Sequence, residues 1–278
     1  MEIVTVTYTR DKWCMVLQAH SLEKFIHKPC IHYVVIEDDS DPVEWDDLLK
    51  NIYKKHKLVL ITKDSHPQVY PQNKKMDGYI YQQIIKFKMH QLMVDSKYLI
   101  LDSKIMFMKS LDLDRTFRYQ GSGFREDVSN PYLSYWKSGI EFVCRKINKP
   151  IPNRVWNPFT PFLVNKKVVE EIMTELDLEK MFEECYRREP IINISEFMVY
   201  AIFSDEETPP KEYGGGYQNG NLEDTLRIVK DKTTFALDRE YLKDVKKRKV
   251  ILNLLLLLGF DKNVANDALT KTVMTTII

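Results

Sequence analysis

Polar side chains follow three of the predicted strands, at the points where those strands end. They are Thr9 and Asp11 after the first strand, Asp38 and Asp39 after the second, and Asp102 after the fourth. In open parallel sheets, ligands bind at the carboxyl ends of the strands. The pattern therefore predicts a ligand site built from carboxylates and a hydroxyl at one edge of a sheet.

Each of these carboxylates also has an ordinary structural interpretation. Asp102 follows the apolar run 98–101, and a carboxylate at the end of a buried strand is costly unless it has a partner. Capping of the next helix or turn would give Asp102 such a partner. Asp38 and Asp39 fit a solvated acidic turn equally well. Both interpretations stay open at this stage.

A predicted helix over about 80–93 contributes a second group of polar side chains. Gln83, Lys86 and His90 recur at intervals of three and four residues, so we expect them to share roughly one face of the helix. Because the helix begins just after Gly78, Gln83 and Lys86 could point at an anion held near the edge of the sheet. The alternative is a solvated helix face.

The elements that must position these residues alternate between strand and helix. Short connections between alternating strands and helices are typical of a parallel sheet covered by helices. We expect an α/β, Rossmann-like fold with helices on both faces of a mostly parallel sheet. The predicted strands are 3–9, 31–36, 58–61 and 98–101, and the helices between the first three are 14–25 and 45–56.

The second half of the chain is less regular. A strand is expected at 162–164, and helices near 132–147, at 167–176 and at 194–203. Residues 208–221 contain two prolines and four glycines, a composition that marks a loop or hinge. A strand-like stretch and a charged helix follow. We therefore expect one domain over 1–210 and a C-terminal strand-and-helix extension, 211–278, packed on it.

Composition excludes several classes of protein. The net charge of +1 at pH 7 does not favour nucleic acid as the partner. Four widely spaced cysteines predict reduced thiols and no metal motif. The N-terminus does not resemble a signal segment, and the longest apolar block, 251–260, is far shorter than the roughly 20 residues needed to span a bilayer. We therefore expect a cytoplasmic protein without a transmembrane segment.

Four short motifs occur in an order that resembles a known group of enzymes. Gly78, Tyr79, Gln82, Gln83 and Lys86 are similar to a Gly-Trp-x-x-Gln-Gln-x-x-Lys helix, with Tyr in place of Trp. A strand ending in an Asp-x-Asp-like sequence follows, and 160–164 and 194–200 resemble a strand and a Ser-Glu-Tyr helix. Together they resemble GT-A glycosyltransferases, in particular a poorly characterised bacterial and phage-borne family.

The resemblance implies the reaction class and a division of the site. A glycosyltransferase of this type moves a sugar from a nucleoside-diphosphate-sugar donor to a glycan or other hydroxyl acceptor. The resemblance and the strand-end pattern place three parts of the substrates. The base and ribose would lie near Thr9, Asp11, Asp38 and Asp102, the diphosphate near Gln83, Lys86 and Lys104, and the acceptor near Glu196.

One departure from the family pattern concerns the metal. Where the family has the second carboxylate of Asp-x-Asp, this chain has Lys104, and an ammonium cannot ligate Mn²⁺ or Mg²⁺ because it has no lone pair. Asp102 would be the only motif ligand if a metal binds. Lys104 could instead stabilise the diphosphate leaving group directly, and it could pair with Asp102.

Three possibilities therefore remain for the reaction: a metal-independent enzyme, a metal-dependent enzyme with other ligands, and a catalytically degenerate GT-A-fold binding or assembly module. A nucleotidyltransferase is a weaker alternative, because residues 7–15 contain no glycine-rich phosphate loop.

Glu196 and Lys104 are the candidate catalytic residues. A carboxylate near the acceptor hydroxyl can act as a base or position the hydroxyl. Ser195 followed by Glu196 is also an ordinary start for a helix. Four aromatic residues could form a stacking platform for a sugar acceptor, or they could be core or lid packing. They are Tyr132, Tyr135, Trp136 and Trp156.

Overall fold

The computed structural model describes residues 1–72, 78–113, 125–127, 134–156, 160–204 and 234–275. Of residues 125–127 and 154–156 only the backbone is described. The predicted loop at 208–221 lies outside these ranges. The predicted division into 1–210 and 211–278 stays a prediction.

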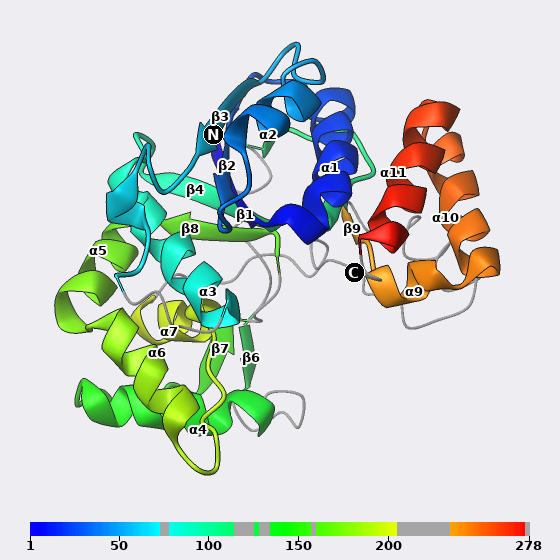
Figure 1. Ribbon diagram of the computed structural model, residues 1–278. Helices are drawn as coiled ribbons and strands as arrows, with labels where there is room; N and C mark the ends of the chain where they lie inside the picture. The colour runs from blue at the N-terminus through cyan, green and yellow to red at the C-terminus, as the bar shows by residue number, and fades with distance from the viewer. Residues whose placement is uncertain (73–77, 114–124, 128–133, 157–159, 205–233, 276–278) are drawn as a thin grey trace.

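A five-stranded sheet forms the centre of the molecule, with strand order β3-β2-β1-β4-β8 (Figure 1). The first four strands are parallel, and β8 pairs antiparallel with β4. The chain therefore forms the predicted mostly parallel α/β sheet. Its strands are β1 (Glu2–Thr7), β2 (Ile31–Ile36), β3 (Lys57–Ile61), β4 (Lys97–Asp102) and β8 (Phe162–Asn165).

Alternation along the strands sends side chains to two separate cores. On β4, Leu99 and Leu101 join the core under α1, whereas Tyr98 and Ile100 join the core under α3, as the two-residue period of a strand requires. The first face is covered by α1 (Lys12–Phe25) and α2 (Pro42–Leu49). The opposite face is covered by α3 (Gly78–Lys88), α5 (Lys166–Glu175), α6 (Leu178–Arg187) and α7 (Glu196–Phe203).

The C-terminal elements complete the core under α1. β9 (Thr234–Ala236) pairs with β5 (Ile105–Phe107), and α11 packs against α1 (Figure 1). These elements are α9 (Arg239–Lys243), α10 (Val245–Leu257) and α11 (Lys262–Met274). Within the described ranges, no helix combines the length and the apolar character that crossing a membrane requires.

The remaining elements are short or lie at one side. α4 (Ser134–Lys146) packs against α7, and β6 (Arg125–Asp127) pairs with β7 (Arg154–Trp156). Single 3₁₀ turns occur at Thr9–Asp11, Pro67–Val69 and Met89–Gln91. All four cysteines are buried free thiols, as predicted.

Several predicted boundaries differ from the structure. α2 begins at Pro42, where the Asp41 side chain accepts from Val43 N, and it ends at Leu49 instead of His56. α3 ends at Lys88 and continues only as a 3₁₀ turn. Sequence reasoning missed α6 and α11, although α6 buries residues at helical spacing, namely Leu178, Met181, Phe182 and Cys185, a pattern that predicts a helix.

Candidate functional site

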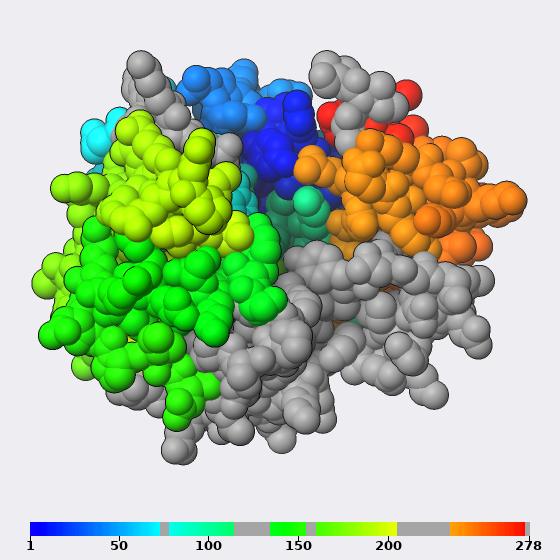
Figure 2. Space-filling model, turned by 90° about the horizontal axis from the view of Figure 1, so that it is seen from below, coloured from blue at the N-terminus to red at the C-terminus, as the bar shows by residue number. Residues whose placement is uncertain are grey.

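A cleft of about 1520 Å³ opens at the carboxyl ends of the parallel strands. In Figure 2 the N-terminal residues, in blue, and residues around position 100, in teal, lie recessed between the yellow-green helices on one side and the orange C-terminal elements on the other. The predicted site residues that line it are Asp11, Asp38, Lys86, Asp102, Lys104 and Glu196. Three elements meet here as predicted: the strand ends, α3 and the start of α7.

A buried lysine joins two carboxylates at the floor of the cleft. The ammonium of Lys86 lies 3.0 Å from Asp102 Oδ1 and 2.8 Å from Glu196 Oε1. The side chains of Lys86 and Glu196 are only 8% and 3% exposed, whereas that of Asp102 is 41% exposed. The group therefore has a formal charge of −1 and presents Asp102 to solvent.

The pKa values in this group move in the directions that burial and pairing dictate. Burial raises the pKa of Glu196 above its ordinary value, against the opposing effect of Lys86. Burial acts in the same way on Asp102, but the charge and hydrogen bond of Lys86 prevail and lower its pKa. Burial would lower the pKa of Lys86, yet the two carboxylates raise it. Lys86 is thus a fixed cation.

The partner of Asp102 differs from the one that sequence reasoning suggested. The sequence allowed Lys104 to pair with Asp102, but Lys86 from α3 does so, and Thr160 Oγ1 donates to Asp102 Oδ2 at 3.0 Å. Lys104 lines the cleft, and none of the described carboxylates makes an ion pair with it. The side chain of a residue in a turn takes its direction from the turn, and sequence proximity alone does not bring Lys104 to Asp102.

Gln83 does not line the cleft, and His90 does not share a face of α3 with Gln83 and Lys86. Gln83 is buried, and its amide oxygen accepts from Glu196 N at 2.9 Å. Among the described residues its amide nitrogen has no hydrogen-bond partner. His90 lies in the 3₁₀ turn after α3 and bonds the carbonyl of Phe87. The prediction for His90 is wrong because the helix ends before it.

Thr9 and Asp38 interact directly with each other. Thr9 donates to Asp38 Oδ2 from its backbone nitrogen at 2.7 Å and from its hydroxyl at 2.6 Å. Burial opposes the effect, but these hydrogen bonds and those of Ser40 lower the pKa of Asp38. Asp38 lines the cleft, and Thr9 holds its carboxylate in place.

Asp11 is neutralised from the C-terminal part of the chain. Arg239 Nη1 lies 3.0 Å from Asp11 Oδ1, Arg239 also donates to Tyr8 Oη at 2.9 Å, and Ser103 Oγ donates to Asp11. Asp11 is only 3% exposed. The C-terminal extension is therefore fastened to the ends of β1 and β4, and Lys104 O accepts from Leu237 N at 2.9 Å.

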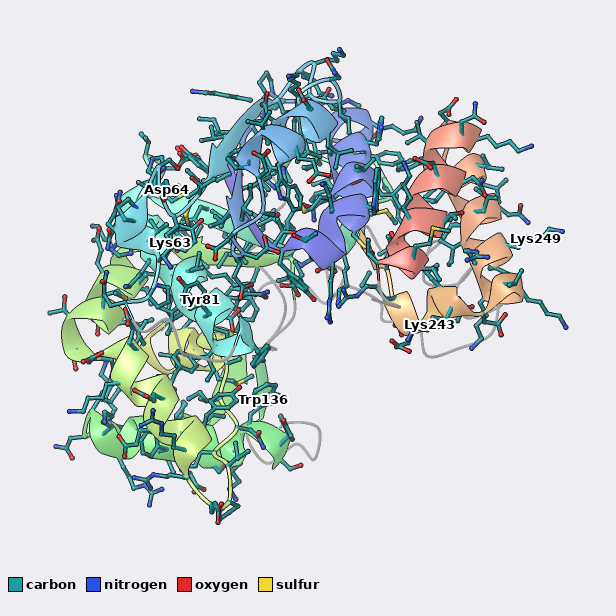
Figure 3. All side chains as sticks on the ribbon, in the orientation of Figure 1. Lys63, Asp64, Tyr81, Trp136, Lys243 and Lys249 are labelled. Carbon is teal, nitrogen blue, oxygen red and sulfur yellow. The ribbon has the colours of Figure 1, made fainter. Side chains whose placement is uncertain are left out.

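Sequence reasoning missed several cleft residues. Lys63 and Asp64 follow β3 and line the cleft with Tyr81 (Figure 3). The rule applied to the other strand ends would have found Lys63 and Asp64. No sequence signal pointed to Asp238, which the C-terminal part contributes.

A stacking platform stays one of two interpretations of the four aromatic residues, because Trp136 also packs against the core under α3. Trp136, from α4, lines the cleft, and the exposed Tyr135 lies edge-on to it with ring centroids 4.9 Å apart. Tyr132 lies outside the described residues, and the side chain of Trp156 is not described. Ser195 caps α7 by accepting from Met198 N, which confirms the capping interpretation for that residue.

The residues at the Asp-x-Asp-like position do not fit a divalent cation. Both oxygens of Asp102 already accept hydrogen bonds, and Lys104 offers a donor where a ligand would be needed. In the described part of the chain, no three His, Cys, Asp or Glu residues are grouped so that they could hold a metal ion.

Comparison with known sequences identifies the family. A family model described as a family of unknown function (DUF6492) matches residues 6–246. The chain belongs to this family. No curated protein matches it.

Solved structures of low sequence identity share its fold. The apo-form glycosyltransferase GlyE of Streptococcus pneumoniae TIGR4 is 12% identical, with a TM-score of 0.54 over 98% of this chain and 64% of that chain. An active-site mutant of LgtC is 11% identical, with a TM-score of 0.51 over 94% and 97%. The bifunctional WbbM is 13% identical, with a TM-score of 0.51 over 85% and 45%.

These likenesses concern architecture. This member of the DUF6492 family has the mixed α/β fold of GT-A glycosyltransferases, as predicted. It spans less than two thirds of the GlyE chain.

Proposed function

We propose that this protein is a glycosyltransferase that moves a sugar from a nucleoside-diphosphate-sugar donor to an acceptor hydroxyl. One observation carries the proposal: in a GT-A fold, the cleft at the strand ends is lined by Asp102 and Glu196, both bound to Lys86, and by Lys104. The cleft volume of about 1520 Å³ exceeds the roughly 300–1,000 Å³ of ordinary ligand pockets, which leaves room for a donor and an acceptor together.

The charges in the cleft suggest a division of labour. Carboxylates suit hydroxyl-rich ligands, because each oxygen accepts a hydrogen bond from a ribose or sugar hydroxyl. A diphosphate needs cations, and Lys86 is already committed to two carboxylates. Lys63 and Lys104 remain for the phosphates. Lining carboxylates come from Asp11, Glu37, Asp38, Asp39, Asp64, Asp102, Glu196 and Asp238, and lining ammonium groups from Lys63, Lys86 and Lys104.

Lys104 is proposed to stabilise the leaving group. When the bond between the sugar carbon and the diphosphate oxygen breaks, negative charge grows on that oxygen. A nearby ammonium stabilises this charge in the transition state. The position of Lys104 in the turn between β4 and β5, two residues after Asp102, supports this role, and it makes the proposed reaction independent of a metal.

Glu196 is proposed to act on the acceptor. Burial raises the pKa of Glu196, and the ammonium of Lys86 opposes that rise. An ionised carboxylate can accept the proton of the attacking hydroxyl, or orient that hydroxyl, while the new glycosidic bond forms and the nucleoside diphosphate leaves. Trp136, on the same cleft, offers an aromatic face to an acceptor sugar.

A second candidate function is a GT-A-fold binding or assembly module without catalysis. Lys104 at the position of a family carboxylate favours it, and so does the commitment of both oxygens of Asp102. The two candidates differ in turnover. Both predict a cleft that holds a ligand.

A thermal-shift panel tests the donor site. UDP-, GDP-, CMP- and dTDP-sugars are each tested with EDTA and with Mn²⁺, since a ligand at a hundredfold excess over its dissociation constant stabilises the native state by about 2.7 kcal/mol. We expect one nucleotide class to raise the melting temperature in EDTA. If no nucleotide-sugar raises the melting temperature under any condition, the proposed donor site is wrong and the non-catalytic module becomes the favoured function.

Variants at Lys104 test its role by the same thermal-shift assay and by the turnover of the donor that binds. Lys104→Ala is expected to weaken nucleoside diphosphate binding and abolish turnover, whereas Lys104→Asp should make activity depend on Mn²⁺. Lys57→Ala is the control, because Lys57 is an exposed lysine at the opposite end of β3. Wild-type protein that is inert without metal and active with it would contradict the role of Lys104.

A further inference from the structure

A buried glutamine holds the turn that carries Asp102 and Lys104. Gln18 lies in α1 and has no exposed surface. Its side-chain nitrogen donates to the carbonyl oxygen of Asp102 at 2.8 Å and to that of Ile105 at 2.9 Å. These two carbonyls bracket Ser103 and Lys104, so one side chain ties both ends of the turn between β4 and β5 to α1.

The orientation of the Gln18 amide follows from its partners. Both protons of its nitrogen are used on carbonyls, so its oxygen is the acceptor for the Thr5 hydroxyl at 3.0 Å. Because the Thr5 hydroxyl donates its hydrogen to Gln18, its oxygen accepts a hydrogen bond from His32 Nε2 at 2.9 Å. His32 Nδ1, lacking a proton, accepts from the hydroxyl of Tyr53 at 2.6 Å.

This chain of hydrogen bonds requires a neutral His32 with its proton on Nε2. His32 is fully buried, and burial together with the nearby His56 lowers the pKa of His32 to about 3. The four side chains come from β1, α1, β2 and the segment after α2, so the chain runs through the interior from Tyr53 to the turn beside the cleft.

We propose that Gln18 is a positioning residue of the candidate site, and that Thr5, His32 and Tyr53 fix the orientation of its amide. The inference rests on the proposed function, because it concerns the placement of Asp102 and Lys104 for donor binding. Losing the amide would leave the carbonyls of Asp102 and Ile105 without this donor. The turn at 102–105 could then adopt other conformations.

The same helix offers a matched control. Ser21 is as buried as Gln18, and its hydroxyl oxygen accepts from Phe107 N at 3.1 Å. Ser21→Ala therefore removes a buried contact between α1 and β5 without releasing the turn at 102–105. Gln18→Met removes the amide while keeping a side chain of similar length.

Two measurements without a ligand test the geometry. In NMR spectra of ¹⁵N-histidine-labelled protein, we expect His32 to be the neutral Nε2–H tautomer. An Nδ1–H tautomer would contradict the proposed chain of hydrogen bonds. In hydrogen exchange, Gln18→Met should accelerate exchange of the amides of 102–105 by about tenfold, and Ser21→Ala should leave these amides near wild type. Unchanged exchange in Gln18→Met would overturn the positioning role.

Thr5→Val serves if Gln18→Met does not fold. It removes only the hydroxyl that orients the amide, and it should accelerate exchange at 102–105 to a smaller extent, while Thr5→Ser restores the wild-type rate. Equal exchange rates at 102–105 in Thr5→Val and wild type would show that Thr5 does not affect the turn, and would contradict the proposed chain of hydrogen bonds.

Donor binding provides the functional test. With the UDP-, GDP-, CMP- and dTDP-sugar panel as probes, Gln18→Met should raise the dissociation constant about tenfold, and Ser21→Ala should change it less than about twofold. Equal affinity in Gln18→Met and wild type would overturn the proposal. If wild type binds no probe, the proposed function fails, and the exchange data still decide whether Gln18 holds the turn.

Discussion

Buried carboxylates occur at both edges of the sheet, and their partners differ. At the amino edge, Glu2 is 3% exposed. Its Oε2 accepts from the backbone nitrogens of Val94 and Asp95 at 2.9 and 2.7 Å, and its Oε1 accepts from the Tyr33 hydroxyl. Nearby, Glu23 accepts from three consecutive backbone nitrogens, those of residues 54–56. Backbone donors fix these carboxylates in place.

At the carboxyl edge Asp102 and Glu196 depend on side chains instead, whereas Asp38 at the same edge also accepts from the backbone nitrogen of Thr9. Asp102 and Glu196 share the ammonium of Lys86 and line an open cleft. Backbone donors are set by the fold, and they hold a carboxylate as part of the scaffold. A carboxylate held by one side-chain cation, with a face toward solvent, keeps capacity for a ligand. The difference separates scaffold carboxylates from candidate site carboxylates.

The largest effect is expected at Glu196. Glu196→Gln should leave nucleotide-sugar binding intact and lower the rate of transfer by about 10²–10⁴, the usual contribution of a general base. Turnover of the best donor from the panel measures it. Glu179→Gln is the control, because Glu179 also pairs with a lysine, Lys88 at 2.6 Å, away from the cleft. Unchanged transfer would reduce Glu196 to a structural residue.

The next effect concerns Lys86. Lys86→Met leaves a buried carboxylate without its cation, a change that costs about 3–5 kcal/mol when both partners are buried. Because Asp102 is 41% exposed, we expect the lower end of that range. Urea unfolding measures the loss, and Lys86→Arg should recover most of it. A loss below about 1 kcal/mol would mean that Glu196 takes up a proton instead of needing Lys86.

His32 should give stability a defined pH dependence. Its pKa is about 3 in the folded protein and about 6.5 when unfolded. Below pH 6.5 the unfolded chain therefore binds a proton that the folded protein does not. Stability should fall as pH falls from 6.5 toward 3, by up to about 1.4 kcal/mol per pH unit. Urea unfolding between pH 7 and pH 5 should show a shallower slope for His32→Gln, and equal slopes would contradict a neutral buried His32.

The smallest effect is expected at the amino edge. Glu23→Gln should lower the free energy of unfolding by about 1–3 kcal/mol, because it removes charge from hydrogen bonds to three backbone nitrogens. Nucleotide-sugar binding and turnover should stay at the wild-type level. Weaker donor binding in this variant would remove the proposed distinction between the two edges.

Much of the scaffold was predictable from local pattern. The apolar runs at 31–36 and 98–101 predict strands, and helices between strands predict a parallel sheet, because only such crossovers bring parallel strands together. The carboxyl ends of these strands share one edge, so the sequence alone predicts that Asp38, Asp102 and Lys104 lie near one another.

Pairing across the cleft was decided only by the tertiary structure. Lys86 and Lys104 both carry the charge that Asp102 needs, and the sequence favoured the nearer one. The packing of α3 and α7 on the same face of the sheet brings Lys86 to Asp102 and Glu196, while the turn after β4 directs Lys104 to the cleft.

The contacts of Gln18 and Arg239 were likewise decided only by the tertiary structure. Gln18 bonds residues more than 80 positions away in the chain, and Arg239 reaches Asp11 from the C-terminal extension. The sequence by itself determined the sheet, its helices and the edge where carboxylates gather, because these follow from periodicities of two and about 3.6 residues. Pairing between residues that are distant in sequence depends on how whole elements pack. That packing cannot be inferred from the local periodicity of apolar residues.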